Sequence, residues 1–246
     1  MVIYQPSRKS GRLKGSKLQV QDRGKRIKFE IFQLLQSPDV ASGLDAIARF
    51  PARKVINSLF LALCSGDEQV KWRAVTAMGR VVGQLADEDM EAARMVMRRF
   101  MWNLNDESGG IGWGCAEAMG EIMAGQAGLA SEYVHMLLSY IQPDGNYLEH
   151  PLLRRGALWG LGRLAQTRPE LLHHWEATRH MIPYLEDGDA PARGLAVWSL
   201  GLLGAGPVRS RIEALLSDDA EIQLYRDGRL ISCRIRELAA EAWSSL

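Results

Sequence analysis

The sequence predicts an all-α protein, an α-solenoid of about five helical repeats, because one helical pattern recurs at a spacing near 40 residues. Four glycines mark this pattern, Gly79, Gly120, Gly162 and Gly201, at intervals of 41, 42 and 39 residues. Each of them has a small residue five positions before it and another two positions before it. A period near 40 with two helices per unit is typical of α-solenoids, in which each repeat packs on its neighbours.

Length and composition favour a folded protein without a membrane span. The chain has 246 residues, of which 47% are hydrophobic and 24% are charged, so it can bury a large core. No apolar run approaches the ~18–20 residues that span a bilayer, and the N-terminus lacks the apolar segment of a secretory signal. Three cysteines without a CxxC pair favour a reducing compartment. We therefore expect a cytoplasmic protein.

The expected organisation is a basic, mostly disordered arm over residues 1–23, followed by one solenoid domain over residues 24–246. Residues 1–28 hold nine Lys or Arg and a single Asp, so their net charge is +8 and that of the rest is −7. Such an arm suits a nucleic acid, an acidic partner or the body of the same chain. A solubilising tail without a partner is the alternative.

Helices are expected along almost the whole domain. Three of them precede the first repeat: from Gly24 to the break at Ser37-Pro38, from Val40 to Phe50, and from Pro51 to the break at Ser65-Gly66-Asp67. Inner helices that carry the repeated pattern then alternate with outer helices, which we expect over 89–103, 131–140, 169–185 and 208–216. A weaker fifth copy of the inner pattern ends the chain.

One small β-hairpin is the only strand prediction. Asp227-Gly228 separates two short extended arms, about 222–225 and 230–233. An Asp-Gly pair between such arms is a strong signal for a two-residue hairpin turn.

The residue twelve positions before each reference glycine is expected to cap the inner helix. Asp67 and Asp189 are good caps at this position, and so is Ser108 in the second copy. His150 stands there in the third copy. Histidine is a poor cap, so we expect this replacement to serve another purpose.

A family resemblance rests on the segments that follow the two capping aspartates. Asp67-Glu68-Gln69-Val70-Lys71-Trp72-Arg73-Ala74 and Asp189-Ala190-Pro191-Ala192-Arg193 each begin with Asp and continue to an apolar residue that is followed by a basic one. In this pattern, over roughly 51–246, the chain resembles the HEAT-repeat family, in particular the HEAT-like repeats typified by phycobilisome lyases. The resemblance implies a fold and leaves function open, because such repeats serve scaffolds, lyases and a class of DNA glycosylases.

The second copy differs from the others in a glycine-rich entry to its inner helix, at Gly109, Gly110, Gly112 and Gly114. Glycine inside a helix costs about 1 kcal/mol relative to alanine. One explanation is that a ligand approaches the backbone there, since free N–H groups at a helix start can hold an anion. The other is that the glycines let this helix pack tightly beneath a tryptophan. No phosphate-loop motif follows.

A stripe of aromatic and charged residues is expected on the concave side, which inner helices line. Positions seven and three before each reference glycine lie on one helix face. They hold Trp72, Trp113, Trp159 and Trp198, together with Glu117 and Arg155. Tryptophans exposed to solvent are unusual unless something covers them. The stripe therefore predicts a groove, unless the tryptophans are ordinary core residues and the face assignment is shifted by one position.

The candidate site combines this stripe with the polar residues of the two neighbouring helix entries. Its catalytic residues and cofactor are unknown, and no metal site is expected. The candidate residues are Trp72, Asn105, Glu107, Ser108, Gly110, Trp113, Glu117, Glu149, His150, Arg154, Arg155, Trp159 and Trp198.

The function that we favour is a non-enzymatic interaction module that binds a protein segment or a small ligand in the groove. One alternative is an enzyme similar to the HEAT-like DNA glycosylases, with Glu117 among the tryptophans and the basic arm holding nucleic-acid phosphates. The net charge of −7 over residues 29–246 argues against a duplex. Another alternative, implied by the resemblance, is a lyase or chaperone for a tetrapyrrole-like cofactor. No membrane partner is expected.

Overall fold

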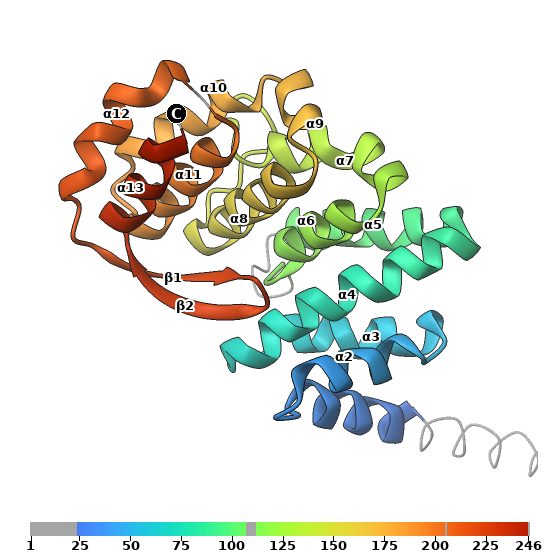
Figure 1. Ribbon diagram of the computed structural model, residues 1–246. Helices are drawn as coiled ribbons and strands as arrows, with labels where there is room; N and C mark the ends of the chain where they lie inside the picture. The colour runs from blue at the N-terminus through green and yellow to red at the C-terminus, as the bar shows by residue number, and fades with distance from the viewer. Residues whose placement is uncertain (1–23, 107–111, 205, 246) are drawn as a thin grey trace, which may run out of the picture.

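The computed structural model describes residues 24–106, 112–204 and 206–245. In these ranges the chain forms a curved stack of helices with one hairpin (Figure 1). The predicted α-solenoid is confirmed. The expected arm, residues 1–23, lies outside the described residues.

Two layers of helices build the stack. A helix over 24–35 opens it, followed by α2 (Val40–Ala48) and α3 (Ala52–Leu63). The inner layer then contains α4 (Glu68–Glu88), α6 (Cys115–Gly125), α8 (Pro151–Thr167), α11 (Ala190–Leu202) and α13 (Ile235–Ser245). The outer layer contains α5 (Met90–Leu104), α7 (Ala127–Ser139), α9 (Pro169–His174), α10 (Ala177–Met181) and α12 (Arg209–Ala214).

Two of the expected outer helices are broken into short pieces. The span 169–185 divides into α9, α10 and the 3₁₀ turn Ile182–Glu186, because Glu176 adopts a left-handed φ of 49° and Pro183 follows soon after. The span 208–216 is α12 with a short 3₁₀ turn on either side.

Two of the described residues expected at the starts of inner helices cap their helix, and one does not. The carboxylate of Asp67 accepts hydrogen bonds from the backbone N–H groups of Gln69 and Val70 and caps α4 as expected. His150 also caps its helix, since its Nδ1 accepts from the N–H of Leu152 at 3.2 Å, so the expectation of another purpose was wrong at that point. Asp189 occupies the cap position of α11 without capping it, because an arginine of α8 takes its carboxylate.

Small residues bring the inner helices into backbone contact. A methyl group added at Gly120 would overlap the Cα of Gly160 on the next inner helix. One added at Gly201 would lie 2.5 Å from the Cβ of Ala242. The repeated small residues therefore mark the helix–helix contact, and the core of apolar side chains fills the space between the two layers.

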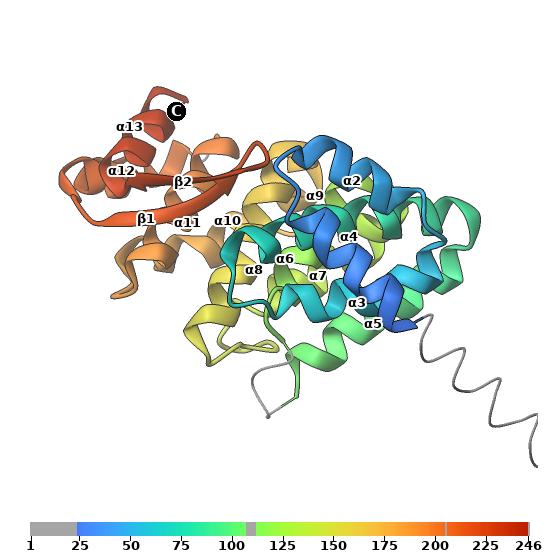
Figure 2. The same cartoon turned by 90° about the horizontal axis from the view of Figure 1, so that it is seen from below.

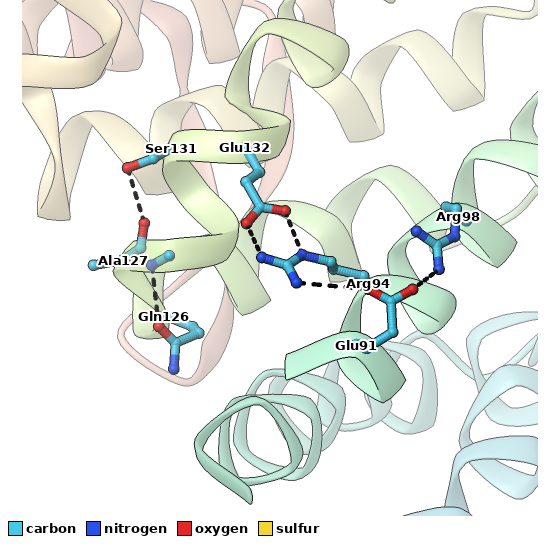
Figure 3. Close-up of polar contacts among 8 residues, drawn as sticks. Glu91, Arg94, Arg98, Gln126, Ala127, Ser131 and Glu132 are labelled. Atoms are coloured by element: carbon cyan, nitrogen blue, oxygen red, sulfur yellow. Dashed lines mark hydrogen bonds and ion pairs between the residues drawn. The ribbon is translucent and has the colours of Figure 1, made fainter. Parts of the chain in front are cut away.

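Polar side chains join successive repeats on the outer side. Arg94 of α5 reaches Glu132 of α7 with contacts of 2.8 Å and 2.5 Å, and also approaches Glu91, which pairs with Arg98 (Figure 3). Arg94 and Glu132 stand 38 positions apart, about one repeat. Solvent screens such exposed pairs, so they orient neighbouring repeats more than they stabilise them.

The predicted hairpin is confirmed as β1 (Glu221–Arg226) and β2 (Arg229–Arg234), an antiparallel pair joined at Asp227-Gly228. It leaves the stack between α12 and α13 and extends along α11 and α8 toward α4 (Figures 1 and 2). The last repeat therefore reaches the first inner helices across the concave side.

We predict that Gly120→Ala destabilises the protein by about 1–3 kcal/mol, because the added methyl group meets backbone that cannot move aside. Urea unfolding followed by circular dichroism measures the change. Gly83→Ala in α4 is the matched control, since nothing lies within 4 Å of its added methyl group. It should stabilise by about 0.5–1 kcal/mol through helix propensity. Equal effects of the two substitutions would contradict the proposed contact.

Candidate functional site

The hairpin is fastened to the concave stripe by Tyr225. Its ring stacks on Trp72 with centroids 4.7 Å apart and an interplanar angle of 10°. Its hydroxyl lies 2.8 Å from Oγ1 of Thr76, and its carbonyl oxygen accepts a hydrogen bond of 2.8 Å from Nε1 of Trp159. Both tryptophans are buried. The expectation of solvent-facing tryptophans was therefore wrong at Trp72 and Trp159, because a distant part of the same chain covers them.

Trp198 does not take part in a groove. It is buried against the preceding inner helix, where a methyl group added at Gly162 would overlap its ring. Its place in the stripe is thus a packing position between α8 and α11.

A cavity of about 610 Å³ remains beside the covered tryptophans. It lies among the N-terminal parts of four inner helices and the hairpin. Its walls are formed by Ser65, Gly66, Glu68, Lys71, Trp72, Trp113, Gly114, Glu117, Leu152, Leu153, Arg155, Gly156, Trp159, Pro191, Leu195, Glu221, Ile222, Gln223 and Leu230.

The cavity borders the short start of α6. This helix begins at Cys115, whereas the other inner helices begin eleven residues before their reference glycines. Gly114 precedes it with a left-handed φ of 72°, and a side chain there would also lie 2.9 Å from the Cβ of Leu63. Gly112 and Gly114 therefore stand in the turn before the helix, so the expected cost of glycine inside a helix does not arise.

Glu117 and Lys71 form an ion pair in the wall of the cavity. Only 4% of Glu117 is exposed, and its Oε1 lies 3.3 Å from Nζ of Lys71. Lys71 is also 3.7 Å from Glu68. Burial alone would lower the pKa of Lys71, but the charges of Glu117 and Glu68 outweigh it and the pKa is raised. The ammonium group therefore stays charged at neutral pH.

Arg155 lines the same cavity, and its positive charge is neutralised by Asp189. Its Nε and Nη2 donate to the two carboxylate oxygens of Asp189 at 2.7 Å and 2.5 Å. This bidentate pair joins α8 to the start of α11 and explains why Asp189 does not cap its helix.

The remaining predicted site residues lie elsewhere. Arg154 donates from Nη1 to the carbonyl oxygens of Leu148 and Glu149 and so braces the turn before its own helix. Glu149 and His150 are exposed outside the cavity wall, and Asn105 is the exposed C-cap residue of α5. Glu107, Ser108 and Gly110 lie outside the described residues.

Sequence reasoning missed the hairpin side of the cavity. Glu221, Ile222, Gln223 and Leu230 line it, yet the sequence gives no signal of where the hairpin lies. Lys71 was recognisable, since it precedes Trp72 in the first repeat and faces Glu117 one repeat later.

Cys115 offers no nucleophile at the site. It is buried, and burial raises the pKa of its thiol to about 12, so the thiolate is absent at neutral pH. Across the described ranges, no group of three His, Cys, Asp or Glu side chains is arranged to hold a metal ion. None of the described helices has both the length and the apolar composition needed to cross a membrane.

Comparisons with known proteins identify the repeat. Residues 151–203 match the model of the HEAT-like repeat. Over this segment the chain is similar to HEAT-like repeats, and its described residues form an α-solenoid. No curated protein sequence is significantly similar to this chain.

Solved structures share the fold at low sequence identity. An engineered protein is 15% identical, with a TM-score of 0.51 and coverage of 89% of this chain and 96% of its own. A designed armadillo repeat protein in complex with the peptide (KR)4 is 16% identical, with a TM-score of 0.50 and coverage of 87% and 97%. The CpcE–CpcF complex of phycocyanin lyase from Nostoc sp. PCC7120 is 19% identical, with a TM-score of 0.46 and coverage of 76% and 97%.

We predict that Lys71→Gln lowers the free energy of unfolding by about 3 kcal/mol at neutral pH, because it leaves the buried Glu117 without its cation. The folded-state pKa of Lys71 is raised. The difference in free energy of unfolding between the wild type and Lys71→Gln is therefore largest below the ordinary lysine pKa of about 10.4. It is lost as the pH rises through the folded-state pKa. Unfolding curves from pH 7 to 12 measure the difference. Lys54→Gln, at an exposed position, is the control and should leave the free energy of unfolding unchanged across this pH range.

We also predict that Tyr225→Ala frees the hairpin. Tryptic cleavage after Arg226 and Arg229 should become at least about tenfold faster, because a stacked ring and a hydrogen bond are lost together. Tyr225→Phe keeps the ring, so its cleavage rate should fall between those of the wild type and the alanine variant. Cleavage of Tyr225→Ala at the wild-type rate would show that other contacts hold the hairpin.

Proposed function

We propose that the protein is a non-enzymatic binding module that takes a segment of a partner protein into the cavity between α4, α6, α8 and the hairpin. One observation carries the proposal. Trp113 and Leu152 border this cavity with 41% and 47% of their surfaces exposed. Large apolar side chains that stay exposed around a concavity are typical of binding surfaces.

The size and composition of the cavity fit this role. Its volume of about 610 Å³ falls within the roughly 300–1,000 Å³ that ligand sites usually have. Tryptophan is among the residues that most often anchor protein interfaces. An inserted side chain would contact Trp113, Leu152 and the floor formed by Gly156 on α8.

Two features favour binding over catalysis. Glu117 is held by Lys71 at 3.3 Å, and the one cysteine beside it keeps its proton because burial raises the pKa of Cys115 to about 12. Neither feature supplies an activated nucleophile or base. A nucleic acid is disfavoured by carboxylates in this wall, which would repel phosphates.

The test is selection from a peptide library displayed on phage, with the Trp113→Ala protein used to remove peptides that bind elsewhere. Peptides that survive should bind the wild type at least about 30-fold more tightly than Trp113→Ala, as expected for loss of an interface anchor. Isothermal titration calorimetry measures both affinities.

Trp175→Ala is the matched control. Trp175 is also 41% exposed but lies outside the cavity wall, so its loss should change the affinity by less than about twofold. A library that yields no binder, or only peptides that bind Trp113→Ala equally well, would overturn the proposed function.

A further inference from the structure

We propose that the residue which the cavity receives from the partner segment is a cationic one, an arginine or a lysine, recognised by Glu117, Glu68 and the face of Trp113. This inference rests on the proposed function and specifies its ligand. It follows from the charges, the hydrogen-bonding capacity and the aromatic faces of the cavity wall.

The described wall carries more negative than positive charge. Glu68, Glu117 and Glu221 line it, together with the cations Lys71 and Arg155. The guanidinium of Arg155 is neutralised by Asp189 through two hydrogen bonds. Lys71, which is paired with Glu117 and lies near Glu68, is then the one cation of the described wall left to balance its three carboxylates. A bound cation would restore the balance, whereas a bound anion would worsen it.

Glu117 retains capacity to accept hydrogen bonds. An ionised carboxylate has about four acceptor sites. Among the residues that the structure describes, its charged partner is Lys71, at 3.3 Å from Oε1. Its carboxylate occupies the space beside the C–H group of Gly156 that a methyl group would fill. A C–H group is a weak donor, so a ligand N–H group would improve the surroundings of a buried charge.

The chain already shows how this wall receives a cation. The ammonium of Lys71 lies 5.0 Å from the ring centroid of Trp72 and between two carboxylates. Trp72 is already occupied, because Tyr225 stacks on its ring, Lys71 lies over it and Trp159 packs against it. Trp113 is 41% exposed at the same cavity, and so offers a face for cation–π contact.

Glu68 adds a carboxylate that the bound cation can reach from solvent. It stands in the first turn of α4 and contacts Lys71 only at 3.7 Å. A guanidinium bound in the cavity would have Trp113, Glu68 and Glu117 in the same wall. An uncharged side chain of the same shape would gain the apolar contact but neither of these charge-assisted hydrogen bonds.

The experiment compares two acetylated and amidated pentapeptides, Ala-Leu-Arg-Leu-Ala and its counterpart with citrulline in place of arginine. Citrulline keeps the shape of arginine and removes its charge. We expect the arginine peptide to bind at least about tenfold more tightly in a fluorescence titration, and this ratio to shrink as salt is raised.

Two variants test whether the preference for arginine over citrulline depends on the carboxylates of the cavity wall. Glu117→Gln and Glu68→Gln should each reduce the ratio between the two peptides at least threefold. Glu68→Gln alters a largely exposed side chain, so its result stands even where Glu117→Gln unfolds the protein. Glu170→Gln, an exposed change on α9 outside the cavity, should leave the ratio unchanged.

The outcomes separate this inference from the proposed function. Equal binding of both peptides, lost in Trp113→Ala, would overturn the cation preference and leave the binding module standing. A preference for arginine that persists in both Gln variants would overturn the assignment to this wall. Absence of binding by either peptide, together with an empty phage selection, would overturn both proposals.

Discussion

Contact between the backbones of adjacent inner helices sets the geometry of the whole solenoid. Where Gly120 meets Gly160 there is no room for a side chain, so α6 and α8 pack closely together. Adjacent outer helices contact one another far less extensively than adjacent inner helices do, and the stack therefore curves. That curvature creates the concave side on which the hairpin and the cavity are found.

The fold could be predicted because its decisive contacts recur in the sequence. A small residue needed once per helix contact appears at a fixed place in each repeat, and the Asp-Gly turn reveals a hairpin from two residues alone. No pattern in the sequence indicates where the hairpin packs on the stack. Tyr225 meets Thr76 across 149 positions, and nothing periodic links the two. The sequence therefore predicted exposed side chains at Trp72 and Trp159, which the hairpin covers in the structure.

The candidate site was predicted in part for the same reason. Register alone placed Trp113, Glu117 and Arg155 on one surface, and all three line the cavity. It could not show that Arg155 is committed to Asp189, since that pairing depends on how α8 approaches the next repeat. Nor could it separate Arg154, which braces its own turn, from its neighbour in the sequence.

The hairpin also changes the mechanics of the molecule. In an open solenoid each repeat contacts only its neighbours. The superhelix can therefore bend along its length, and its two ends can unfold independently. Here the contact between Tyr225 and Trp72 ties the last repeat to the first inner helices. Any motion that straightens the curve must strain or break this tie. The contacts of Tyr225 with α4 and α8 therefore restrain the opening of the stack beside the cavity.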